Sequence, residues 1–337
     1  MTQTQKDRDA LREWAVFYES GLRRQNSDVN LTQAQIAKDR ARLEADPIEW
    51  ISFFFPEYCK FEFAEFQIKA IRRCIKHEEW FEVLSWARGL AKSTTVMFIV
   101  MYLALTKKKC NVMMASATQD SAVRLLDPYK KQFEENALIR AYYGVQVNLG
   151  NWCAEEFITK CGCSFRAVGA GNAPRGSRNG AVRPDVLLVD DFDTDEGCRN
   201  PDTIDKNWTW WEKALYGTRD TAVKTLIVFC GNIIARDCCV VRAGHMADHW
   251  DVVNIRDEKG YSTWPSKNTE ESIDIALSKI STAAQQTEYF NNPVTEGEVF
   301  KEITYGKVPD LKKFQFLVIY GDPARTRART AVRKAVS

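Results

Sequence analysis

From about residue 80 onward, short apolar runs alternate with helical segments, and this alternation constrains the fold more than any other feature. The apolar runs have the length of buried strands, and helical segments connect them. Strands that are joined by helices form a parallel sheet with helices on both faces. The sequence therefore predicts an α/β fold, with strands at 81–85, 111–116, 185–189 and 225–229 and helices at 93–106 and 121–135.

The chain as a whole divides into four regions: 1–45, 46–252, 253–310 and 311–337. The first is expected to be a helical N-terminal segment, in which Thr32 and Gln35 form a capping box that opens a helix at 32–45. The second contains the alternating pattern and is the expected core. The third is rich in proline and is expected to be a loop-rich lid and linker, and the fourth begins with an apolar strand at 314–320.

Composition excludes several classes of protein. The net charge of +2 is nearly balanced, so a nucleic-acid partner would be met by local basic patches. The longest apolar run, 96–105, is too short to span a bilayer, and the N-terminus lacks the features of a signal peptide. The ten cysteines include no C-x-x-C pair, which favours free thiols in a reducing cytoplasm. His245 and His249 are four residues apart, a spacing that fits one helix face, and a surface or core role is expected for them in preference to a metal site.

The segment WARGLAKST, from Trp86 to Thr94, lies between a predicted strand and a predicted helix. A phosphate-binding loop (P-loop) needs inward backbone N–H groups, a lysine for the β- and γ-phosphates and a hydroxyl for Mg²⁺. Lys92 and Ser93 match the last two requirements, and the N-terminus of the next helix adds its dipole. Trp86 and Ala91 replace the two outer glycines of the usual pattern, so a chance Lys-Ser pair at the start of a helix stays open as the alternative.

Two adjacent carboxylates follow the apolar strand at 185–189. Asp190 and Asp191 would stand at its carboxyl end, where a parallel sheet binds its ligand. Asp190 is suited to hold Mg²⁺, directly or through water, and Asp191 to orient and deprotonate the attacking water. Acidic residues after strands are common in loops, so the combination with Lys92 carries more weight than either motif alone.

Several segments resemble the large subunits of phage terminases, which are DNA-packaging ATPases. They occur in the order that this family uses: RGLAKST, MMASATQDSA, AVGAGNAPRGSRNGAVRPDVLLVDD, WPSKNTEE and QQTEYFNNPVTEGEVFK. The resemblance covers about residues 61–322. It implies a RecA-like P-loop ATPase that binds ATP and Mg²⁺. The nucleotide would contact Arg88, Gly89, Leu90, Ala91, Lys92, Ser93 and Thr94, and Mg²⁺ would lie between Ser93 and Asp190.

The same resemblance assigns roles to individual residues. Arg88 matches an arginine that stabilises charge on the transferring phosphoryl group, which makes Arg88, Lys92 and Asp191 the expected catalytic residues. Asp191 stands where many relatives have glutamate. Gln67 resembles the glutamine that reads adenine, with a plain surface amide as the alternative. Asn232 resembles part of the motif that senses the γ-phosphate, where a hydroxyl residue is more usual.

Two further parts of the resemblance concern DNA and a second activity. Arg175 and Arg178 lie in a glycine-rich loop suited to a neighbouring subunit's nucleotide or to DNA phosphate, with a merely solvated loop as the alternative. The strand at 314–320 and Asp322, a metal ligand by analogy, resemble the start of the terminase nuclease, an RNase H-like fold. No acidic residue follows Asp322, whereas two-metal cleavage needs several carboxylates. The expectation is a nuclease domain truncated after its first strand, without nuclease activity.

The function implied by the resemblance is a motor that hydrolyses ATP to move double-stranded DNA into a preformed capsid. Such a motor would act in the host cytoplasm, away from any membrane, as a homo-oligomeric ring with a portal protein and a terminase small subunit as partners. Two alternatives stay open: a helicase-like P-loop ATPase, which shares the early motifs, and an inactive prophage remnant.

Overall fold

The computed structural model describes residues 32–174 and 179–293, which all belong to one compact unit. Its centre is a seven-stranded sheet with the order β3-β4-β2-β5-β6-β1-β7. The strands are β1 (Trp80–Trp86), β2 (Asn111–Ser116), β3 (Glu156–Ile158), β4 (Ser164–Gly169), β5 (Val186–Val189), β6 (Leu226–Cys230) and β7 (His249–Val253). The strands predicted at 81–85, 111–116, 185–189 and 225–229 are confirmed as β1, β2, β5 and β6.

The neighbouring strands of this sheet are parallel, except that β3 pairs antiparallel with β4. β3 differs because only the turn at 159–163 connects it to β4. This turn includes Gly162 at φ +94°, and so short a connection reverses the chain, whereas a parallel pair needs a crossover of a dozen or more residues. The predicted parallel sheet is thus confirmed for most of its strands, and the antiparallel edge strand is a departure from it.

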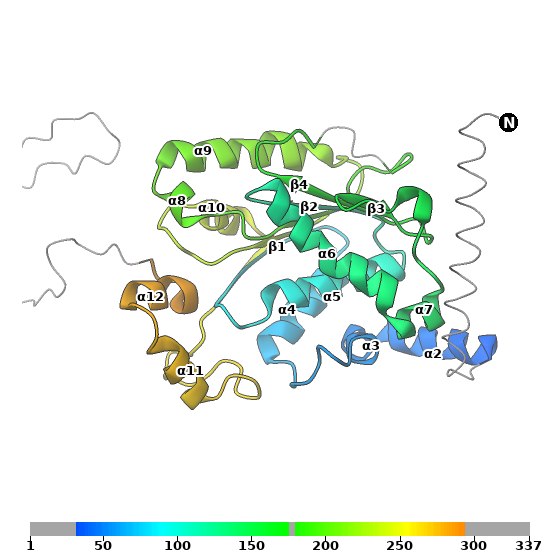
Figure 1. Cartoon of the computed structure of the whole chain (residues 1–337), viewed down its shortest axis with the longest axis horizontal. Helices are drawn as coiled ribbons and strands as arrows, with labels where there is room; N and C mark the ends of the chain where they lie inside the picture. The colour runs from blue at the N-terminus through cyan, green and yellow to red at the C-terminus, as the bar shows by residue number, and fades with distance from the viewer. Residues whose placement is uncertain (1–31, 175–178, 294–337) are drawn as a thin grey trace, which may run out of the picture. The chain divides into compact units, whose positions relative to one another are not determined.

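Helices cover both faces of the sheet (Figure 1). Successive residues of a strand point to opposite faces, so that Leu84 enters one apolar core and Val83 the other. The first core is completed by α4 (Glu65–Lys76), α5 (Lys92–Leu105), α6 (Gln119–Glu135) and α7 (Ala137–Tyr143), and the second by α9 (Pro201–Trp210) and α10 (Cys239–Met246). The helices predicted at 93–106 and 121–135 are confirmed as α5 and α6. Shorter helical elements are α8 (Asp195–Cys198), Leu149–Asn151, Trp211–Leu215 and Tyr216–Thr218.

The central helix α5 is apolar on nearly every side. All of its residues from Thr95 to Leu105 are buried, as expected for a helix that lies inside a domain. Beneath it lies the sheet, and α4 and α3 (Pro47–Phe54) pack against it as well. This enclosure fixes the N-terminus of α5 against the carboxyl end of β1.

The N-terminal helix of the described part, α2 (Gln33–Ala45), begins as the sequence predicts. Thr32 caps it, and the reciprocal bonds of a capping box with Gln35 are present. Asp46 then caps α3, whose Trp50 and Phe54 are completely buried in the core. Local polar caps thus set the ends of these helices, and aromatic burial attaches them to the domain.

The region after β7 is more ordered than the loop-rich expectation. It contains α11 (Glu270–Leu277) and α12 (Thr282–Phe290), which Thr269 and Ser281 cap. Trp264 and Leu277 from this region are buried in the same core as α5. Residues 254–269 and 278–281 are loops, but the two helices were not predicted, because they are short and lie among proline- and glycine-containing loops, where periodicity is hard to see. The domain boundaries themselves remain predictions.

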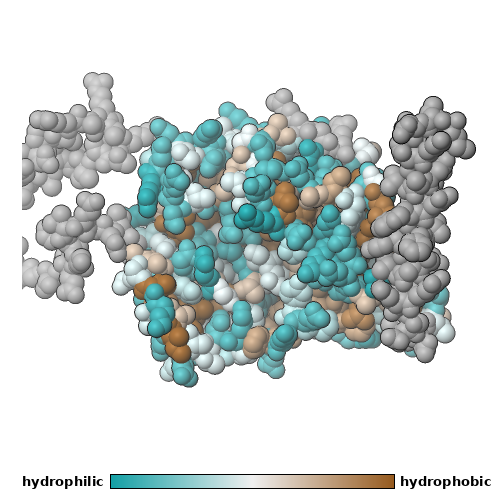
Figure 2. All heavy atoms as spheres, viewed as in Figure 1, coloured by the Kyte–Doolittle hydropathy of each residue, from teal (hydrophilic) through white to brown (hydrophobic). Residues whose placement is uncertain are grey.

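Several predictions concern residues outside the described ranges: the N-terminal segment before residue 32, Arg175, Arg178, the strand at 314–320 and Asp322. In the part of the chain that is described, every helix is too short or too polar to cross a membrane. On the face shown in Figure 2, hydrophilic side chains predominate and apolar ones form small separate groups.

Candidate nucleotide-binding site

The loop between β1 and α5 combines left-handed backbone with an uncapped helix N-terminus. Gly89 adopts φ +86° and Ala91 adopts φ +58°. A left-handed conformation costs a residue with a Cβ roughly 1–2 kcal/mol, so Ala91 carries strain that the missing glycine would avoid. Within the described residues no side chain caps the first turn of α5. Its N–H groups and the positive end of its dipole are therefore available to an anion.

Ser93, in that first turn, contacts the carboxylate at the end of β5. The Ser93 hydroxyl donates to Asp190 Oδ2 at 2.5 Å, and the Asp191 N–H donates to Asp190 Oδ1 at 3.1 Å. Asp190 is only 3% exposed. Burial raises the pKa of its carboxyl group, while the nearby Lys92 ammonium and the Ser93 hydroxyl act in the opposite direction. The two donors hold this carboxylate against the start of α5.

Asp191 continues from Asp190 into open space. Its backbone is left-handed, at φ +47°, and its carbonyl oxygen accepts from the Ser116 hydroxyl at 3.3 Å, which ties the ends of β5 and β2 together. Its side chain is exposed and lines a cavity of about 820 Å³. Other residues of the predicted site that line it are Arg88, Gly89, Ala91, Lys92, Ser93, Thr94 and Asn232, and the cavity is called the nucleotide cavity after this prediction.

Two hydrogen bonds in series link the loop with α12. Lys92 Nζ donates to Asn232 Oδ1 at 2.9 Å, and Asn232 Nδ2 donates to the Glu288 carbonyl oxygen at 2.7 Å. Because Asn232 follows β6, these two hydrogen bonds connect the carboxyl ends of β1 and β6 with the segment after β7. The hydrogen-bond partner of Lys92 here is a neutral amide and not a carboxylate.

Arg88 is directed at α12. Its Nε donates to Glu288 Oε2 at 2.7 Å, and its backbone N–H donates to the Glu288 carbonyl oxygen at 2.8 Å. Lys267 Nζ donates to the carbonyl oxygen of Gly89 at 2.8 Å. Neither Glu288 nor Lys267 was among the predicted site residues, although both lie in segments that carry the terminase resemblance.

Gln67 lies beneath the loop and not on the surface. It is 1% exposed, its amide nitrogen donates to the Leu90 carbonyl oxygen at 3.2 Å, and its amide oxygen accepts from the Ala64 N–H at 3.0 Å. The alternative of a surface amide is therefore wrong. The Leu90 side chain is itself buried, so only the backbone of Leu90 is suited to contact a phosphate.

The chemistry of these groups fits Mg²⁺ and a nucleotide polyphosphate. Mg²⁺ prefers hard oxygen ligands, and the Ser93 hydroxyl with the Asp190 and Asp191 carboxylates supplies them at one edge of the sheet. Lys92 and the uncapped start of α5 supply positive charge for phosphate oxygens. Seven of the predicted nucleotide contacts thus come together around one cavity, with Gln67 and Leu90 in supporting positions below.

A different group of titratable residues lies at the far end of β1. Ligand atoms of Glu82, His249 and Asp251 lie within 4.8 Å of one another. Arg73 Nη2 contacts Glu82 Oε1 at 2.6 Å and Asp251 Oδ2 at 3.1 Å, so a guanidinium already supplies the positive charge. His245 and His249 do not share a helix face, because α10 ends at Met246 and His249 begins β7.

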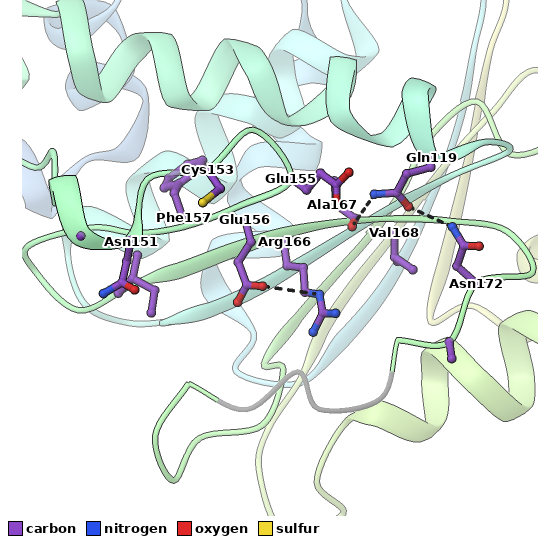
Figure 3. Close-up of a pocket in the computed structure, with 13 residues that line it drawn as sticks. Gln119, Asn151, Cys153, Glu155, Glu156, Phe157, Arg166, Ala167, Val168 and Asn172 are labelled. Carbon is purple, nitrogen blue, oxygen red and sulfur yellow. Dashed lines mark hydrogen bonds and ion pairs between the residues drawn. The ribbon is translucent and has the colours of Figure 1, made fainter. Parts of the chain in front are cut away.

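A further cavity of about 610 Å³, the edge cavity, lies over β3 and β4 (Figure 3). Four of its polar side chains contact one another in two pairs, and Asn151, Cys153 and Glu155 line it as well. Arg166 pairs with Glu156 at 3.8 Å, and Gln119 donates to the Ala167 carbonyl oxygen and accepts from Asn172 Nδ2 at 3.0 Å. Among the described residues, none of the predicted site residues lines it.

Comparisons with known proteins place the fold. No family model matches the sequence, and no curated protein matches it. Among solved structures, the chain is similar to the crystal structure of the bacteriophage HK97 large terminase, with a TM-score of 0.51 and 12% sequence identity. The match covers 74% of this chain and 55% of that one, so the chain spans little more than half of that terminase. The likeness is one of fold: a mostly parallel sheet covered by helices.

Proposed function

We propose that this chain is an Mg²⁺-dependent ATPase whose hydrolysis drives double-stranded DNA into a phage capsid, as in the motor subunit of a terminase. The observation that carries the proposal is the meeting of Lys92, Ser93 and Asp190 at the start of α5, where the Ser93–Asp190 contact measures 2.5 Å. The fold, which is similar to that of the HK97 large terminase, supports the same function.

In the proposed mechanism, the loop and the first turn of α5 bind the phosphates. Lys92 neutralises the β- and γ-phosphates, and the backbone N–H groups of the loop orient them. Ser93 and Asp190 would hold Mg²⁺, which when bound would supply positive charge for the phosphate oxygens. The Ser93 hydroxyl donates a hydrogen bond to Asp190, which leaves the lone pairs of its oxygen free to act as a ligand.

Asp191 is the proposed base. Its exposed carboxylate lies in the nucleotide cavity one residue beyond Asp190, and its left-handed backbone turns it out of the strand direction. From there it accepts a hydrogen bond from the attacking water and takes its proton.

Arg88 and Asn232 connect hydrolysis with α12. Arg88 pairs with Glu288, and Asn232 contacts both Lys92 and the Glu288 backbone. A bound γ-phosphate competes with the Glu288 carboxylate for Arg88, because both are anions within reach of one guanidinium. Binding of the γ-phosphate would thus weaken the Arg88–Glu288 contact between the loop and α12. Release of that phosphate after hydrolysis would restore the contact.

The test of this function is phosphate release by the purified chain. We expect hydrolysis of ATP with Mg²⁺, none with a chelator, and loss of activity to background in Lys92→Ala with an unchanged melting curve. Lys131→Ala, which removes an exposed lysine on α6 paired with Glu135 at 3.9 Å, is the matched control. Wild-type turnover in Lys92→Ala would exclude this loop as the site.

Two outcomes would favour the alternatives. A folded chain that binds no nucleotide would favour the inactive remnant. Hydrolysis that is stimulated by single-stranded DNA and separates a duplex would favour the helicase-like ATPase. Hydrolysis stimulated by double-stranded DNA, with packaging into purified capsids once the portal and small subunit are supplied, is the result that the proposal requires.

A further inference from the structure

A cavity of about 440 Å³ adjoins the nucleotide cavity on the other side of Asp190, between α5 and α6. The two cavities share Ser93, Thr94, Ser121 and Asp191. Tyr129, from α6, also lines the smaller one. The Ser93–Asp190 contact therefore has the phosphate loop on one side and a space lined by α6 on the other.

The aromatic ring of Tyr129 is packed in the core, but its hydroxyl is buried there as well. It belongs to the apolar face of α6 with Ala122, Leu126 and Phe133, and its ring centroid lies 6.0 Å from that of Phe165. It is 1% exposed, yet its hydroxyl has no hydrogen-bond partner among the described residues. An unsatisfied buried hydroxyl destabilises a fold, and phenylalanine would fill the same space without that penalty.

The charge that acts most strongly on this hydroxyl is that of Asp190, the carboxylate of the proposed ion site. Burial raises the pKa of Tyr129 well above its usual range, and the charge of Asp190 adds to the effect, so the hydroxyl stays a proton donor. Asp190 accepts one hydrogen bond on each oxygen, from Ser93 and from the Asp191 N–H. Each carboxylate oxygen has two acceptor sites, so Asp190 has capacity for another donor.

We propose that Tyr129 is a positioning residue of the Mg²⁺ site: its hydroxyl donates to Asp190, directly or through one water in the smaller cavity, when the ion is bound. This inference rests on the proposed ATPase function. Ser93 and Asp190 would hold the ion, and a third hydrogen-bond donor, from α6, would fix the orientation of the Asp190 carboxylate. The Tyr129 hydroxyl, which has no partner among the described residues, would thus gain one when Mg²⁺ is bound.

The experiment measures how strongly Mg²⁺ promotes nucleotide binding, without any turnover. A fluorescent ADP analogue is titrated against wild type and Tyr129→Phe, once with a chelator and once over a range of Mg²⁺ concentrations. We expect equal affinities with the chelator. The Mg²⁺ concentration for half-maximal enhancement should be about tenfold higher in Tyr129→Phe, which corresponds to one hydrogen bond to a charged group.

Tyr102→Phe is the matched control, because Tyr102 is a buried tyrosine of α5 whose hydroxyl donates to the Glu44 carbonyl oxygen at 2.7 Å. The two variants should behave in opposite ways. Tyr129→Phe should melt at or above the wild-type temperature and lose Mg²⁺ coupling, whereas Tyr102→Phe should melt lower and keep it. Unchanged coupling in Tyr129→Phe overturns the inference while the ATPase proposal stands. Nucleotide binding by wild type that ignores Mg²⁺ overturns both.

Discussion

The nucleotide cavity and the edge cavity have comparable volumes, about 820 and 610 Å³, but they obtain their polar groups in different ways. The nucleotide cavity collects side chains from the ends of β1, β5 and β6, from α5 and from α12. The polar groups of the edge cavity come mainly from one hairpin, its flanking segments and the start of α6, and four of them contact one another in pairs. Volume alone therefore does not separate a binding site from a surface hollow.

The difference follows from strand direction. Parallel strands end at the same edge of the sheet, so the residues after β1, β5 and β6 meet there even though they are far apart in sequence. β3 runs antiparallel to β4, so its carboxyl end lies beside the start of β4. Its neighbours in space are then mostly its neighbours in sequence. Convergence of groups from separate strands is the feature that marks the nucleotide cavity.

Asp191→Asn should give the largest effect on catalysis after loss of Lys92, because it removes the proposed base. We expect kcat to fall by up to about 10⁴-fold, while binding of Mg·ADP stays near the wild-type level. Asp190→Asn, measured in parallel by titration with the fluorescent ADP analogue and by phosphate release, should lose both binding and turnover. Equal loss of binding in the two variants would contradict this division of roles between Asp190 and Asp191.

Arg88→Ala should lower kcat by ~10³-fold, since a guanidinium on the transferring phosphoryl group acts mainly on the transition state. The affinity for ATP should change less, because Arg88 is 69% exposed and pairs with Glu288 before the nucleotide arrives. Single-turnover hydrolysis and equilibrium binding separate the two effects. A collapse of affinity at constant kcat would make Arg88 a residue that binds the ground state.

Glu288→Gln should produce a smaller change in the opposite direction. It removes the carboxylate that competes with phosphate for Arg88, so ATP affinity should rise by about two- to fivefold, the free energy of an exposed ion pair. Glu270→Gln is the matched control, because Glu270 pairs with Arg256 at 2.9 Å on α11 and does not line the nucleotide cavity. Weaker ATP binding in Glu288→Gln would mean that this contact supports the loop instead of competing for it.

Arg166→Ala should give the smallest effect and is the direct test of the edge cavity. Arg166 pairs weakly with Glu156, at 3.8 Å, and the pair is partly exposed, so stability should change by less than about 0.5 kcal/mol. ATP hydrolysis should equal that of wild type. A marked loss of hydrolysis or of DNA stimulation would break the contrast between the cavities and give the edge cavity a function.

The sequence by itself determined the strands β1, β2, β5 and β6, the helices α5 and α6, and the two motifs of the site, whereas β3, β4 and β7 were not predicted. β2 coincides with its predicted range, 111–116, because a buried strand is encoded by a contiguous apolar run. Lys92 and Ser93 are adjacent, so their placement at the start of α5 follows from local pattern alone. Asp190 required one step more, the rule that parallel strands end at one edge.

Only the tertiary structure decided which distant residues meet. Arg88 and Glu288 are 200 residues apart, and no local period records that contact. The same holds for Lys267 on the Gly89 carbonyl, for Tyr129 beside Asp190, and for His249 beside Glu82. Periodicity reports how a segment folds and which of its faces is apolar. The partner of that face is chosen by packing in the finished domain, since it depends on all the other segments together.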